Sequence, residues 1–101
     1  MVINKVFKGT KGLEVRFAVD QDISDALEMI LYYYKPESKI VSYVEAEAEG
    51  TGTLLGIIES VDEEGDWYFQ GWAKLSNSKE VFTDIVRHKI FASLRDYQSS
   101  S

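Results

Sequence analysis

Two groups of acidic side chains are the first residues of this sequence whose type and spacing suggest chemistry. They lie within residues 20–25 and 62–66, and their members are Asp20, Asp22, Asp25, Asp62, Glu63, Glu64 and Asp66. Calcium takes several oxygen ligands, which acidic loops can supply, but neither group has the spacing of an EF-hand loop. Acidic residues are also common in turns, where they bond to nearby backbone. We expect solvated turns here and no metal or other cofactor.

His88 is the only histidine, and it is the natural centre for any acid–base chemistry. A catalytic triad needs a nucleophile and a carboxylate placed around the imidazole, and no spacing in the chain suggests this. The Gly50-Thr51-Gly52 segment lacks the ending of a phosphate-binding loop. We therefore expect His88 to be an ordinary hydrogen-bonded strand residue, and the protein not to be an enzyme.

Aromatic residues are the stronger functional signal. Residues 67–75 alternate, so that Trp67 and Phe69 share one face of a strand while Tyr68 and Trp72 share the other. With Trp67 in the core, Tyr68 and Trp72 point outward. Exposed tyrosine and tryptophan are enriched at protein interfaces and sugar-binding faces. We predict that Tyr68 and Trp72 anchor an interface, with Tyr32 or Tyr34 beside them.

The composition limits the class of protein and its partners. The chain has 101 residues, no cysteine and a formal net charge of −6, which suits a single domain that depends on neither disulfides nor thiolate metal sites. Nucleic-acid binders usually carry a basic face, and anionic membranes attract basic segments, so we expect neither as a partner. No apolar stretch reaches the ~20 residues of a membrane-spanning helix, and no signal peptide is evident.

Alternating apolar residues predict strands along most of the chain, separated by turn signals. The expected strands lie at residues 3–8, 13–19, 27–35, 40–48, 54–60, 67–75 and 81–91. In the last of them the alternation slips near Asp84 or Ile85, which predicts a β-bulge. In the fourth and directly after it, we expect glutamates at the edge of a sheet, where they prevent edge-to-edge pairing; these are Glu45, Glu47 and Glu49.

Residues 25–35 leave a choice between helix and strand. Ser24 is a suitable N-cap, and helix-forming residues follow it. Against this, Ile30 and the three tyrosines at 32–34 favour a strand. A strand at 27–35 would continue through a hairpin turn at 35–38, which contains Pro36, into the next strand. We predict the strand.

About seven strands in succession predict an all-β fold, an antiparallel immunoglobulin-like β-sandwich. We assign residues 1–92 to this single domain and residues 93–101 to a polar C-terminal tail.

Four segments in order give a more particular likeness, namely KGLEVRF at residues 11–17, DISDA at 22–26, YKPES at 34–38 and EGDWYFQ at 64–70. With them the chain resembles the small immunoglobulin-like virion proteins of tailed bacteriophages, and is similar to the N-terminal domain of phage baseplate upper proteins. The resemblance implies a strand rather than a helix before the YKPES turn. It also implies no catalytic residues and a role in particle assembly.

The expected function is therefore that of a non-enzymatic structural protein of a phage particle, in the tail, baseplate or capsid periphery. Its partners would be other virion proteins in a symmetric multi-copy assembly, formed in the host cytoplasm and retained in the virion. The alternative is a carbohydrate- or ligand-binding β-sandwich module, assisted by calcium, that uses the same aromatic residues.

Overall fold

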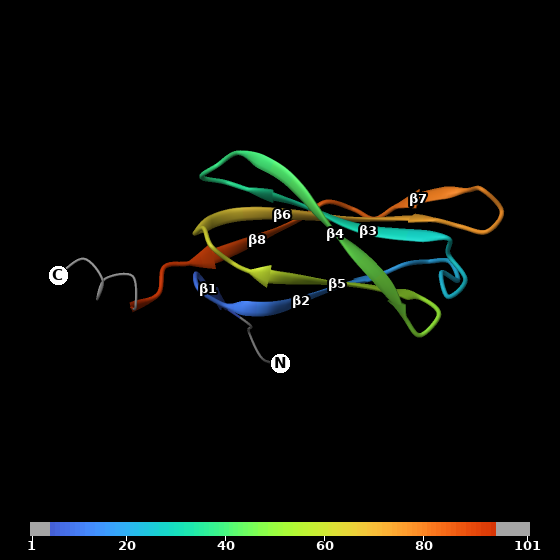
Figure 1. Ribbon diagram of the computed structural model, residues 1–101, viewed down its shortest axis with the longest axis horizontal. Helices are drawn as coiled ribbons and strands as arrows, with labels where there is room; N and C mark the ends of the chain where they lie inside the picture. The colour runs from blue at the N-terminus through green and yellow to red at the C-terminus, as the bar shows by residue number, and fades with distance from the viewer. Residues whose placement is uncertain (1–4, 95–101) are drawn as a thin grey trace.

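Alternating apolar residues form eight β-strands within residues 5–94, the part of the chain that the computed structural model describes (Figure 1). In chain order the strands are β1 Val6–Phe7, β2 Lys11–Ala18, β3 Glu28–Lys35, β4 Ile40–Glu49, β5 Thr53–Ser60, β6 Gly65–Lys74, β7 Glu80–Phe82 and β8 Val86–Phe91. Strand accounts for 61% of these residues and they contain no helix. The all-β prediction is confirmed.

The strands form one sheet in the order β1-β8-β6-β3-β4-β5-β2, with β7 pairing with β6 as well. Neighbouring strands are antiparallel except β1 and β8, which are parallel. The sheet is therefore mixed, and it curls into a half-barrel. The finer prediction, an antiparallel immunoglobulin-like sandwich of about seven strands, is not confirmed.

The long strand β4 turns the sheet from one half of the half-barrel into the other. Its residues 40–45 pair with β3, and its residues 46–49 pair with β5. Figure 1 shows β4 crossing from the β3 side of the molecule to the β5 side. The prediction that its glutamates mark an edge strand is wrong for β4 as a whole, because β4 lies between β3 and β5 in the strand order. Each glutamate nevertheless has a strand partner on one side only, since Glu45 pairs with β3, and Glu47 and Glu49 pair with β5. Of these glutamates, Glu49 forms an ion pair, with Arg16 of β2 at 2.8 Å.

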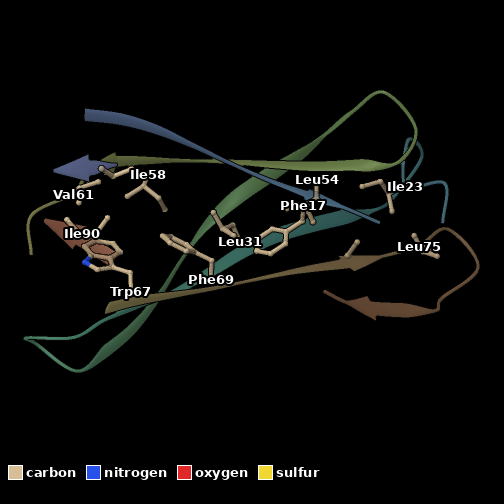
Figure 2. Packing of buried hydrophobic residues seen from close by; sticks show 12 residues of the cluster. Phe17, Ile23, Leu31, Leu54, Ile58, Val61, Trp67, Phe69, Leu75 and Ile90 are labelled. Atoms are coloured by element: carbon tan, nitrogen blue, oxygen red, sulfur yellow. The ribbon is translucent and has the colours of Figure 1, made fainter. Parts of the chain in front are cut away.

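The core lies inside the curl, between the β2–β5 half and the β3–β6–β8 half. Figure 2 shows its largest side chains, which come from both halves and include Phe17, Leu54, Trp67 and Ile90. The two halves are in tight contact at Gly56 of β5, where a Cβ atom would lie only 2.6 Å from Leu31 Cδ2. Glycine at this position lets the halves meet.

Two predictions about local structure have clear outcomes. Residues 28–35 form a strand, so the choice against a helix is confirmed. The change in alternation near Asp84 and Ile85 marks a break between β7 and β8, and the predicted β-bulge within one strand is wrong. Thr83 holds this break against β6, because its Oγ1 accepts a hydrogen bond from Gly71 N (2.8 Å) and its N–H donates one to Gly71 O (3.0 Å).

Both ends of the predicted domain fall partly outside the described residues. The predicted first strand, residues 3–8, is observed at Val6–Phe7, and its residues 3 and 4 lie outside. The predicted polar tail, residues 93–101, lies outside from residue 95 onward.

Candidate protein-binding face

The convex side of β3, β4 and β6, with β7 and Ile85 beside it, carries a continuous group of aromatic and aliphatic side chains. We call this the outer aromatic face, and its residues are Ile30, Tyr32, Tyr34, Val41, Tyr43, Tyr68, Gln70, Trp72, Phe82 and Ile85. Residues opposite each other in a sheet share a face. Because Tyr32 lies opposite Tyr43 and Gln70 in register, the face extends across all three central strands.

The alternation of β6 determines which of its side chains reach this face. Trp67 and Phe69 point into the core, where Trp67 is completely buried. Tyr68 is 39% exposed, and Trp72 is half-buried on the same side. The predicted orientation of the β6 aromatics is thus confirmed.

All four residues predicted as interface anchors lie on the outer aromatic face. The rings of Tyr34 and Tyr68 pack edge to face with centroids 5.9 Å apart. Tyr32 packs against Tyr43 at 6.2 Å. Trp72 lies at the β7 end of the face, opposite Ile30 and Phe82 in register. A shallow apolar hollow of about 140 Å³ lies between the tyrosines, Val41 and Ile85.

The most exposed residues of the face were not among the predicted anchors. Val41, Tyr43, Phe82 and Ile85 are each more than 60% exposed. The exposure of Tyr43 could have been predicted from the sequence. Tyr43 and Glu45 are two residues apart in one strand, so their side chains point to the same side, and a glutamate is expected to point outward. The positions of Phe82 and Ile85 depend on the break between β7 and β8, which alternation alone does not locate.

Two polar side chains of the face form hydrogen bonds within the protein. The indole N–H of Trp72 donates to Glu80 Oε1 at 3.0 Å, and Gln70 Nε2 donates to Thr83 O at 2.9 Å. The tyrosine hydroxyls of the face make no hydrogen bond within residues 5–94. The face therefore offers a largely apolar surface with a few hydroxyls, which is the composition of a protein interface core.

The acidic loop at residues 62–66 has a structural role at one end of the face. Asp62 pairs with Lys35 at 2.9 Å, and this hydrogen bond raises the pKa of Lys35. Glu63 Oε1 accepts hydrogen bonds from the backbone N–H groups of Glu37 (2.8 Å) and Ser38 (3.0 Å). Partial burial raises the pKa of Glu63, but the hydrogen bonds from Ser38 and Glu37 outweigh it and the net shift is downward. The loop thereby fastens the β3–β4 turn to the start of β6.

In the other acidic loop, two of the three carboxylates accept hydrogen bonds from serine residues. Asp22 Oδ1 accepts from the hydroxyl and the backbone N–H of Ser24 at 2.6 and 2.9 Å, and both bonds lower the pKa of Asp22. Asp25 accepts a bond from the Ser76 hydroxyl at 3.3 Å. In the described part of the chain, no group of three or more His, Cys, Asp or Glu side chains is placed to hold a metal ion.

His88 lies in β8 opposite Trp67. Its Nε2 atom is buried and has no hydrogen-bond partner among the described residues. The prediction of an ordinary hydrogen-bonded histidine is therefore wrong for this atom.

Comparison of the chain with protein-family models, curated proteins and solved structures found no match. Within residues 5–94 no helix is long and apolar enough to cross a membrane.

Proposed function

We propose that this chain is a non-enzymatic structural module that assembles in several copies through the outer aromatic face. The observation that carries the proposal is the exposure of Val41, Tyr43, Phe82 and Ile85, each above 60%, on one continuous face. Soluble monomers rarely expose large contiguous apolar patches, and those that do usually bind a partner there.

The chemistry of the face suits contact between copies. The tyrosine pairs supply rigid, amphipathic contact area at low cost in side-chain entropy. At the Trp72 end, Lys74 lies between Glu28 and Glu80 in register, so charges of both signs border the apolar area. A two-fold arrangement would let the Lys74 of one copy meet a glutamate of the other.

The setting that we propose is a tailed-phage particle, in its tail, baseplate or capsid periphery, with assembly in the host cytoplasm. Support for this setting comes from the four sequence segments that resemble phage virion proteins. The immunoglobulin-like affiliation belongs to the same proposal, and the packing of two sheet halves over one core is consistent with it. No observation favours the alternative, a sugar- or calcium-binding module, over this function.

Sedimentation velocity over a wide range of protein concentration tests the assembly. We expect the wild type to self-associate and the double variant Val41→Lys with Ile85→Lys to remain monomeric. The matched control is Ile57→Lys, because Ile57 is 45% exposed, lies on β5 and is not one of the residues of the outer aromatic face. A wild type that is monomeric at every concentration, or an Ile57→Lys variant that dissociates equally, would refute the proposal.

The setting needs its own measurement. Purified particles of a phage that encodes the chain should contain the wild-type protein, and should contain the Val41→Lys, Ile85→Lys variant in reduced amount. Absence of the wild-type protein from particles would exclude the virion role and leave the self-association result standing.

A further inference from the structure

Within residues 5–94 the curled sheet does not close on itself. Among the described strands β2 pairs only with β5, while β8 pairs with β6 and, at Ile90 and Phe91 alone, with β1. A groove that we call the seam runs between β2 on one side and β7 and β8 on the other. Its two hollows, of about 330 and 510 Å³, adjoin each other, because Phe17, Ala18 and Val86 line both.

The walls of the seam are strand edges that lack a neighbour. At residues 86–89, β8 pairs with β6 on one side and has no strand partner on its other edge in the part of the chain that the structure describes. The edge of β2 that faces away from β5 has no strand partner there either. Unpaired edges of this kind are templates for an added strand. Through the antiparallel pairs of the sheet, β2 and β8 run in opposite directions. A segment that pairs antiparallel with β2 would therefore run parallel to β8, as β1 already does.

The floor of the seam is apolar. Phe17 and Phe69 form its buried part, and Val86 is 45% exposed at its wall. The same hollow contains His88, whose buried Nε2 has no hydrogen-bond partner among the described residues. Buried polar atoms are nearly always paired in native structures. A backbone or side-chain group of an added segment would supply the missing partner.

The two ends of the seam differ in charge. Asp20 and Asp84 line the larger hollow, and no lysine, arginine or histidine lines it with them. Neither carboxylate forms an ion pair within residues 5–94. Complementary charge selects partners and speeds their association, so this end of the seam favours a basic group. This acidic end of the seam lies where β2 ends and β8 begins. A bound segment that runs parallel to β8 would have its N-terminal residues there.

We propose that the seam binds an extended segment of a partner protein as an added strand antiparallel to β2. The segment carries apolar side chains at alternate positions and a lysine or arginine at its N-terminal end, beside Asp20 and Asp84. Its apolar side chains cover Phe17 and Val86. This site is separate from the outer aromatic face, and its test does not depend on self-association.

Selection from a displayed library of random octapeptides tests the proposal. The wild-type protein should enrich sequences that begin with a basic residue and then alternate apolar with polar residues. Binding of the enriched peptides, measured by fluorescence anisotropy, should weaken by roughly tenfold or more in Val86→Arg, which fills the seam and repels the basic end. Ile57→Arg is the matched control, since Ile57 is equally exposed at 45%, and it should bind like the wild type.

The single histidine gives an independent readout. In NMR spectra the ring signals of His88 should shift on addition of an enriched peptide and stay unchanged with its proline-interrupted version. Replacing Asp84 with asparagine should weaken binding of peptides that begin with Lys or Arg, and leave peptides that begin with serine unaffected.

Three results would overturn the proposal. The first is the absence of enrichment, or enriched peptides that bind Val86→Arg and the wild type equally. The second is a wild-type oligomer that Val86→Arg dissociates, which would assign the seam to a second copy of the chain. The third is a peptide affinity that rises about tenfold in Ile3→Asp, which would assign the seam to the first residues of the chain itself.

Discussion

The two tryptophans of β6 show how one strand can serve two unrelated purposes. Trp67 is fully buried, stacks on Tyr33 with ring centroids 5.8 Å apart, and donates from Nε1 to the backbone oxygen of Glu63 at 3.0 Å. Trp72 lies on the opposite face and donates to an exposed carboxylate, that of Glu80. Both indole N–H groups are satisfied, so hydrogen bonding does not distinguish them. The difference is burial, and it separates the residue that holds the fold from the one available to a partner.

The largest expected effect comes from removing the buried tryptophan. Trp67→Ala should lower the free energy of unfolding by roughly 3–5 kcal/mol, the usual cost of truncating a buried aromatic side chain. Trp72→Ala should cost less than half as much, because its ring borders solvent. Urea denaturation followed by circular dichroism measures both. Equal losses for the two variants would contradict the assignment of separate roles.

A second experiment extends the comparison to the opposite wall of the core. Gly56→Ala should destabilise the protein by roughly 1–3 kcal/mol, because the new methyl group overlaps Leu31. Leu31→Val removes the Cδ atoms but leaves the Cβ 2.8 Å from the new methyl group, so it reduces the overlap without removing it. Gly56→Ala combined with Leu31→Val should therefore cost somewhat less than the sum of the single changes. Additive losses, again from urea denaturation, would show that the halves are not in tight contact at this point.

A third prediction concerns the loop that receives the Trp67 hydrogen bond. Folding lowers the pKa of Glu63 below its ordinary value of 4.5, so the carboxylate contributes to stability above that pH. The contribution disappears as the pH falls through the lower pKa of the folded state. Glu63→Gln should therefore be less stable than the wild type at pH 7, and the two should converge in acid. If the difference in free energy of unfolding between the wild type and Glu63→Gln stayed constant from pH 7 to pH 3, the lowered pKa of Glu63 would be contradicted.

The smallest effect is expected for the outward indole. Trp72→Phe keeps an aromatic ring on the outer aromatic face and removes only the exposed bond to Glu80. We expect the free energy of unfolding to change by about 1 kcal/mol or less. Sedimentation velocity should nevertheless detect weaker self-association, because tryptophan is among the residues that contribute most to interfaces. A thermal melt that reveals a large loss of stability would place Trp72 among the core residues.

Alternation within a strand was the most informative feature of the sequence, because it fixes which side chains share a face. It predicts that Trp67 points into the core and Tyr68 outward, as the structure has them. It does not identify which strands are neighbours. For that reason Glu45 and Glu47 suggested an edge, although β4 lies between β3 and β5.

The seam depends on contacts that sequence patterns do not encode. Phe17 and Val86 belong to strands far apart in the chain, and their proximity follows from the curl of the whole sheet. The break at residues 83–85 also arises from pairing, since Thr83 bonds to Gly71 of a neighbouring strand. The parallel β1–β8 pair is equally a product of long-range topology.

The position of β4 has a consequence for how the molecule unfolds. Because β4 pairs with β3 in one half and with β5 in the other, unfolding of either half removes a paired strand from the remaining half. Neither half can therefore act as an independent folding unit, and the chain should unfold in a single cooperative transition. For the same reason, a mechanical force applied to one half would be transmitted to the other half through β4.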